Sequence, residues 1–146
     1  MIRAVGFDDA RALAEAMSDE MKVLYDSDEG ATPVEAAAFE PPGVFLVLAV
    51  DGVDVACGGL TVIADGIGEV KRMYVAPTHR GSGLARDLLR SLVQHARDTG
   101  LREVWLETGT RQVPAVALYE SEGFAPIPPY GYWKDHPETL CYRLVL

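Results

Sequence analysis

The segment with the clearest chemical signature is a glycine-containing turn between a predicted strand and a predicted helix. It reads Arg80, Gly81, Ser82, Gly83, Leu84, Ala85 and Arg86. The first backbone amides of a helix lack partners, and the helix dipole places about half a positive charge there. Glycine lets a ligand approach the main chain closely, and arginine adds charge-assisted donors suited to phosphate. The pattern predicts a binding site for a pyrophosphate group.

Two other interpretations of this turn are open. The glycines can serve only the backbone shape of a tight strand-to-helix connection. Alternatively, the turn belongs to a dinucleotide-binding fold, in which an acid about 20 residues further on binds ribose, as Glu103 would. Against that fold, Arg86 replaces the third glycine and five residues separate Val75 from Gly81. The strands before the turn also form a meander and not a βαβ unit.

Three side chains are candidates for proton transfer, namely Glu69, Glu107 and Tyr119. A carboxylate can act as a general base and a tyrosine hydroxyl as a general acid. Each residue also has a structural interpretation. Glu69 fits an ordinary polar strand position, Glu107 fits a strand-end carboxylate that orients a loop, and Tyr119 fits a core tyrosine with a bonded hydroxyl.

The elements that position these residues begin with a short strand at 2–5. Asp8 is expected to cap a helix that carries Ala10, Leu13, Ala14 and Met17 at helical spacings. The acidic, proline-broken segment 26–43 is expected to be a flexible flank beside the site, with a weak helical stretch at 35–39.

Three strands are predicted next, at 44–50, 53–63 and 67–75, because Asp-Gly turns separate β-rich runs. A helix follows over 83–99, and Gly100 ends it.

The strand at 103–108 completes a βαβ unit and is therefore parallel to 67–75. A helix that begins near Pro114 continues over 115–122 and is closed by Gly123, and a final hairpin runs from Phe124 to a last strand at 139–146. The predicted class is α+β, with one mixed, mostly antiparallel sheet, a central parallel pair and helices on both faces. A single domain covers residues 1–146.

Composition limits the function. The chain has 146 residues, a net charge of −9 and a pI near 4.7, which argues against nucleic acid as a partner. Cys57 and Cys141 lack metal-ligand spacing, so we expect free buried thiols and no metal. No signal-peptide pattern begins the chain, and the longest apolar run, 44–50, is too short for a membrane helix. We expect a cytoplasmic protein without a membrane partner.

The turn resembles motif A of the GNAT superfamily of N-acetyltransferases, whose pattern is Arg/Gln-x-x-Gly-x-Gly/Ala. Arg80, Gly83 and Ala85 fill the three defined positions, and ALYESEGF is similar to the family's second motif. The resemblance implies the GNAT fold and acetyl-CoA as the donor, with its pyrophosphate on the amides from Gly81 to Arg86.

The resemblance also implies that the strand before the turn is bulged and splays from its parallel neighbour. Pantetheine would then pair with the backbone at Met73 and Val75, and an amide at Met73 or Tyr74 would polarise the thioester carbonyl. Many relatives have an asparagine that contacts pantetheine, where this chain reads GTRQVP. Arg111 or Gln112 would replace that contact, and Arg111 would reach a CoA phosphate.

The family's chemistry implies that Tyr119 donates a proton to the CoA sulfur. The base is Glu69, on a strand where some members carry it, or Glu107, whose spacing to Tyr119 is that of the ribosomal-protein N-terminal acetyltransferases. The expected reaction is direct transfer to a primary amine of a small molecule or peptide, because no cysteine lies in either motif. A non-catalytic acyl-CoA-binding module is the alternative. A homodimer is compatible with the fold.

The acceptor side offers two further observations. Tyr130, Tyr132 and Trp133 lie in a proline-rich loop, where they either cover the edge of the core or line an acceptor pocket or dimer contact. Residues 71–90 hold five Lys or Arg and one Asp, a net charge of +4 that leaves −13 elsewhere. An acidic surface around a basic donor site predicts modest steering of cationic acceptors.

Overall fold

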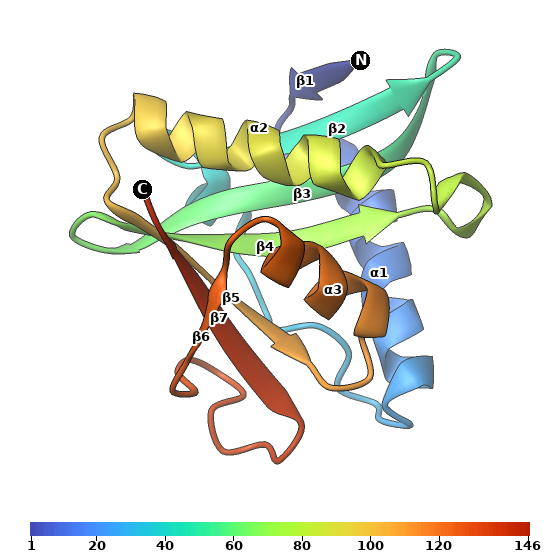
Figure 1. The fold of residues 1–146 in the computed structure, drawn as a ribbon. Helices are drawn as coiled ribbons and strands as arrows, with labels where there is room; N and C mark the ends of the chain where they lie inside the picture. The colour runs from blue at the N-terminus through green and yellow to red at the C-terminus, as the bar shows by residue number, and fades with distance from the viewer.

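The computed structural model describes all 146 residues, which form one seven-stranded sheet with the order β1-β2-β3-β4-β5-β7-β6 (Figure 1). The strands are β1 Ile2–Ala4, β2 Val44–Val50, β3 Val53–Ala64, β4 Ile67–Val75, β5 Glu103–Gly109, β6 Ala125–Ile127 and β7 Thr139–Val145. The helices are α1 Arg11–Leu24, α2 Leu84–Asp98 and α3 Val113–Ser121, with 3-10 turns at Phe7–Ala10, Ala36–Phe39 and Pro77–His79. No helix is long and apolar enough to cross a membrane.

The predicted fold class is confirmed. Every pair of adjacent strands is antiparallel except the central pair, β4 and β5. The helices α2 and α3 pack on one face over a core that includes Leu88, Leu92 and Phe124. On the other face, α1 and the 3-10 turns Phe7–Ala10 and Ala36–Phe39 cover a smaller cluster around Phe45 and Phe39 (Figure 1).

Local sequence explains the element ends. At the two Asp-Gly hairpin turns, Gly52 and Gly66 have φ near +80° and +74°, a region that glycine occupies without strain. The end of α2 is also as predicted, because Gly100 follows the last helical turn with φ +82°. The meander and the βαβ unit are therefore confirmed at nearly the predicted boundaries.

One predicted cap is wrong. Asp8 lies inside the 3-10 turn Phe7–Ala10, where it pairs with Arg11, and no side chain caps α1. The packing of Phe7 against Phe39 and Phe45 explains the difference, because it fixes the chain as a 3-10 turn before the α-helix can begin.

The central parallel pair is short. β4 and β5 pair only from Ile67 opposite Glu103 to Val70 opposite Leu106. Beyond these residues β4 continues along β3 to Val75, while β5 continues along β7. The two strands thus splay apart, and they leave one backbone edge of residues 71–75 without a strand partner.

A bulge accompanies the splay. The register of β3 against β4 shifts between Cys57 and Gly59, so β4 carries one extra residue there. Arg72 lies at this bulge, with φ +61°. The bulge and the splay that the family resemblance implies are therefore both present.

Candidate active site

The glycine turn is open and its amides are free. The backbone N–H groups of residues 81–86 donate no hydrogen bond within the chain. Gly81 and Gly83 both have φ +84°, and a Cβ at either position would meet no atom within 4 Å. Free amides at the start of α2, beside open space, are what an anion-binding site requires, and binding of the pyrophosphate there stays a prediction.

Arg80 anchors the turn and does not face the open space. Its Nη2 lies 2.8 and 2.9 Å from the carboxylate oxygens of Glu20 in α1, and its Nε donates to the Val75 carbonyl at 2.8 Å. The guanidinium also lies over the Tyr74 ring. Ser82 donates its hydroxyl to the His79 carbonyl at 3.0 Å. These contacts fix the shape of the turn, and direct binding of a phosphate by Arg80 stays a prediction.

Arg86 lies between α2 and α3. Its Nη2 donates to Ser121 Oγ at 3.1 Å, and Glu122 is 4.0 Å from its Nε. That Nε is buried and has no hydrogen-bond partner. The neighbouring Leu84 and Ala85 pack partly into the core, which holds the first turn of α2 in place. The Arg86 side chain therefore connects α2 to α3, and its contact with a phosphate stays a prediction.

Residues 73–75 of β4, where the thioester and pantetheine are predicted to bind, come just before the glycine turn. Met73 packs against the main core, and Tyr74 packs against the smaller cluster on the other face. Val75 pairs with Ala56 of β3, so the opposite edge of this stretch faces the gap left by β5. Pairing of pantetheine with Met73 and Val75 stays a prediction that this open edge permits.

Glu69 is buried and fully paired. Its side chain is 8% exposed, with Lys71 Nζ 2.8 Å from Oε1 and the Tyr130 hydroxyl donating to Oε2 at 2.6 Å. Burial, reinforced by the charge of Glu69, raises the pKa of Tyr130 above its ordinary value. Both oxygens of Glu69 already hold a donor from the chain.

Glu107, in contrast to Glu69, has a carboxylate oxygen without a partner. Its Oε2 is buried without a hydrogen-bond partner, close to the backbone of Gly131. Burial raises the pKa of Glu107, and the nearby Trp133 amide lowers it only in part. The residue lies on β5 just beyond the last pair with β4, at the opening of the splay.

Tyr119 lies in α3 with its ring against Phe124, at a centroid distance of 5.9 Å. Its side chain is buried, and no group of the chain hydrogen-bonds to its hydroxyl. Burial raises the pKa of Tyr119 to about 12, which keeps the hydroxyl protonated across the physiological range.

The loop before α3 is tied to the end of α1. Arg111 donates to Glu138 Oε1 at 2.8 Å and to the Leu24 carbonyl at 3.1 Å, and its guanidinium lies over the Tyr25 ring. Gln112 donates to the Tyr25 hydroxyl at 3.2 Å. Of the two predicted replacements for asparagine, Arg111 is committed to structural contacts, while Gln112 precedes α3 directly.

Sequence reasoning did not single out Lys71 or Thr32, and it did not connect Tyr130 and Trp133 to their partners. Lys71 fills one oxygen of Glu69, and Thr32 accepts a hydrogen bond from the Trp133 indole at 2.7 Å. Tyr130 packs edge-on against Trp105, while Tyr132 is 61% exposed. Tyr130 thus contacts both the Glu69 carboxylate and the Trp105 ring, and an acceptor pocket lined by this loop stays a prediction. No signal in the sequence connects Thr32 or Tyr130 to residues so distant along the chain.

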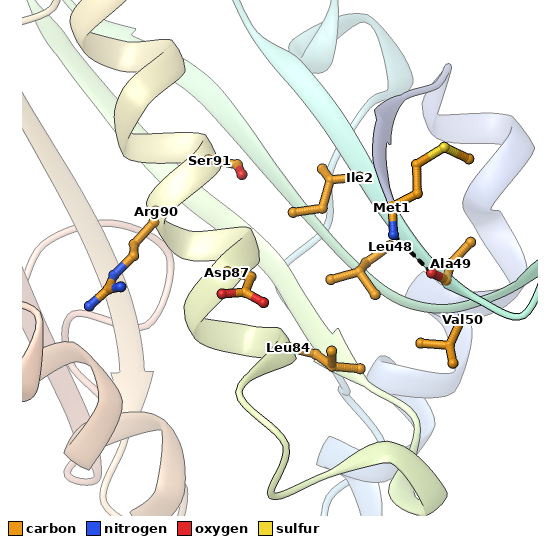
Figure 2. A pocket seen from close by; sticks show the side chains of 9 residues that line it. All are labelled: Met1, Ile2, Leu48, Ala49, Val50, Leu84, Asp87, Arg90 and Ser91. Carbon is orange, nitrogen blue, oxygen red and sulfur yellow. Dashed lines mark hydrogen bonds between the residues drawn. The ribbon is translucent and has the colours of Figure 1, made fainter.

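A separate hollow of about 510 Å³ lies between α2 and the β1–β2 edge (Figure 2). Ile2, Leu48 and Val50 supply much of its apolar lining, and Leu84 is its one residue from the glycine turn. Its one basic side chain, Arg90, is bound to Glu122 at 2.5 Å. The hollow therefore holds none of the proton-transfer candidates. No group of three His, Cys, Asp or Glu side chains converges anywhere in the chain.

Comparison with known proteins defines the class. The sequence pattern of the Acetyltransferase (GNAT) family matches residues 10–124, which is most of the chain. The chain therefore belongs to the GNAT family of acetyltransferases, and the resemblance carried by the two motifs is confirmed.

Individual relatives agree with this assignment. An IAA acetyltransferase of Azospirillum brasilense is 42% identical over 97 residues, covering 66% of this chain and 63% of that protein. An uncharacterised N-acetyltransferase of Schizosaccharomyces pombe is 33% identical over 120 residues, covering 80% of this chain and 72% of that protein. The matched part spans less than two thirds of the Azospirillum protein.

Solved structures show the same fold. A Klebsiella pneumoniae structure assigned as an acyl-CoA N-acyltransferase has a TM-score of 0.84 at 28% identity, covering 100% of this chain and 97% of that one. The PaiA N-acetyltransferase of Thermoplasma acidophilum, solved with coenzyme A, has a TM-score of 0.76 at 16% identity, covering 100% and 98%. At that lower identity the likeness concerns the fold alone.

Proposed function

We propose that the chain transfers the acetyl group of acetyl-CoA to a primary amine by direct attack within a ternary complex. The observation that carries this proposal is the juxtaposition at one opening of the sheet. Free amides of residues 81–86 lie at one strand end, and an unpaired buried oxygen of Glu107 lies on the facing strand. An anion-binding turn and a base beside one gap suit a donor with a pyrophosphate and an acceptor that must lose a proton.

The donor would be held mainly by main-chain groups. The amides of residues 81–86 would receive its phosphates, and the guanidinium of Arg86, in the first turn of α2, would add positive charge there. The unpaired edge at 71–75 would take its pantetheine arm as an added strand. Gln112 is the polar side chain in place of the family's usual asparagine. Acetyl-CoA itself supplies an activated thioester carbonyl.

Glu107 is the proposed base. A carboxylate accepts a proton best through an oxygen that no other donor occupies, and when burial raises its pKa. Oε2 of Glu107 is such an oxygen, and burial raises the pKa of Glu107 although the Trp133 amide and the Thr32 hydroxyl lower it in part. Glu69 offers no free oxygen, because Lys71 and Tyr130 already occupy both of its oxygens. We assign Glu69 to positioning: it ties the aromatic loop to β4.

Tyr119 is the proposed acid. As the amine nitrogen bonds to the acetyl carbon, Glu107 takes a proton from that nitrogen, and the carbon–sulfur bond breaks. The departing sulfur then takes the hydroxyl proton of Tyr119. Glu107 afterwards releases its proton to solvent, and solvent returns a proton to Tyr119. The unbonded, protonated hydroxyl of Tyr119 supports this role.

A screen for CoA release tests the proposal. The purified protein is mixed with acetyl-CoA and a panel of amines, and free thiol is followed over time. We expect turnover with at least one acceptor and formation of its N-acetyl product. Tight CoA binding without turnover on any amine would instead indicate the non-catalytic binding module. Binding of NAD in preference to CoA would indicate the dinucleotide-binding alternative.

A further inference from the structure

Arg72 is a half-buried cation that lacks a counter-ion. Among the Lys and Arg side chains that are not fully exposed, Lys71 pairs with Glu69 at 2.8 Å and Arg86 has Glu122 at 4.0 Å. Arg72 forms no ion pair, and its guanidinium donates to the backbone carbonyl of Thr32. Burial of an unpaired guanidinium is costly, because the charge cannot be removed by deprotonation.

The backbone at Arg72 is also held in an unfavourable conformation. Its φ of +61° is one of three positive values among non-glycine residues, and the other two, Asp26 and Asp51, lie in turns. Arg72 alone adopts it within a strand, at the bulge where β4 leaves β5. Strained residues of this kind concentrate at functional sites, where the strain places a side chain.

The guanidinium of Arg72 lies at Thr32, close to the aromatic loop and to Glu107. Thr32 receives Arg72 at its carbonyl and the Trp133 indole at its hydroxyl. The same Thr32 hydroxyl lies close enough to Glu107 to lower its pKa in part. The free cation and the proposed base therefore approach a single residue from two directions.

We propose that Arg72 binds a carboxylate of the acceptor, so that the substrate is a compound carrying both an amine and a carboxylate. This inference rests on the proposed function. A guanidinium has five N–H donors in a planar fork, and the Thr32 carbonyl leaves most of them free for bidentate pairing with a carboxylate. The amine of the same molecule would then lie toward Glu107.

For binding of the acceptor, the charges within the site matter more than the net charge of the chain. The net charge of −9 predicts steering of cations, but exposed charges are screened beyond about 10 Å. Within the site, Lys71 neutralises Glu69, and Arg72 is left over. An amino acid, with one positive and one negative group, matches the pair formed by Glu107 and Arg72.

The test compares α-, β- and γ-amino acids with their carboxamides as acceptors at saturating acetyl-CoA. After correction for the fraction of uncharged amine, we expect kcat/KM for at least one acid to exceed that of its amide tenfold or more. Arg72→Met should reduce this ratio to about one, and Arg72→Lys should retain part of it. Equal use of acids and amides by the wild type would overturn the proposal, as would an equal loss on both in Arg72→Met.

Arg97→Met serves as the matched control, because Arg97 is an exposed cation of α2 that forms no ion pair. It should leave the acid-to-amide ratio unchanged. Calorimetry with CoA-loaded protein separates this inference from the proposed function. Binding of an acid but not of its amide, lost in Arg72→Met, supports the carboxylate site even if no amine is acetylated. No difference in binding between acid and amide would refute the site in that case.

Discussion

Substitution of two glycines with the same backbone geometry tests whether the turn before α2 binds the donor. Gly83 has φ +84° at the start of α2, and Gly52 has φ +80° in the β2–β3 hairpin turn. A Cβ at either position would meet no atom within 4 Å. Gly83→Ala and Gly52→Ala therefore impose similar strain without a clash, and they differ in whether free amides surround the added methyl group.

The expected magnitudes follow from this geometry. An alanine forced into the left-handed region costs about 1–2 kcal/mol, and for a chain of this size each kcal/mol lowers Tm by roughly 3 °C. Both variants should therefore lose about 3–6 °C. Only Gly83→Ala places a methyl group where phosphate oxygens must approach the amides of residues 81–86, and we expect about a tenfold weaker Kd for CoA.

Calorimetric titration with CoA, together with thermal unfolding of each apo variant, provides the measurement. The reasoning about the turn is refuted if Gly83→Ala binds CoA as tightly as Gly52→Ala while both show the same loss of Tm. A similar loss of CoA affinity in both variants would show that general destabilisation, and not the turn itself, controls binding.

Three further predictions concern the chemistry. Tyr119→Phe should lower kcat about 100-fold with little change in Tm or in Kd for CoA, because no group of the chain bonds to the hydroxyl; an unchanged kcat removes Tyr119 as the acid. In a pH profile, kcat should fall toward acid as Glu107 gains a proton, at a pH above 4.5 because burial raises its pKa. Glu107→Gln should lack this limb and lose about 100-fold or more in kcat. Cys57→Ser with Cys141→Ser should retain turnover, since both thiols are buried and the pKa of Cys57 is raised to about 12; mass-spectrometric capture of an acetyl-cysteine would contradict direct transfer.

Local sequence patterns were sufficient to predict most of the fold. The Asp-Gly turns specify the meander because both glycines must take positive φ, and the apolar stripe of α2 faces the core as its spacing requires. Glycine placement likewise located the free amides at 81–86. These features depend on residues that are neighbours in the chain, so the sequence contains the whole physical cause.

Local sequence patterns could not decide between the two candidate bases. Glu69 and Glu107 are both strand carboxylates with similar local surroundings. The difference between them comes from Tyr130, which closes over Glu69, and from Lys71, which points to the same side. Pairing across the 61 residues between Glu69 and Tyr130 depends on the tertiary fold. The Asp8 cap failed for a related reason, since aromatic packing decided the geometry there.

The choice of acceptor likewise depends on the tertiary fold and not on composition. Composition describes the average charge of the chain, whereas recognition depends on the few charges that are removed from solvent and unmatched. The acidic residues that produce the net charge of −9 are mostly exposed, and screening limits their reach to about 10 Å. Arg72 is half-buried, lacks a carboxylate partner, lies at the β4 bulge, and contacts Thr32, which also lies close to the proposed base Glu107. One unmatched cation at that position therefore influences the acceptor more than a larger number of distant acids, and its effect should survive added salt that abolishes steering.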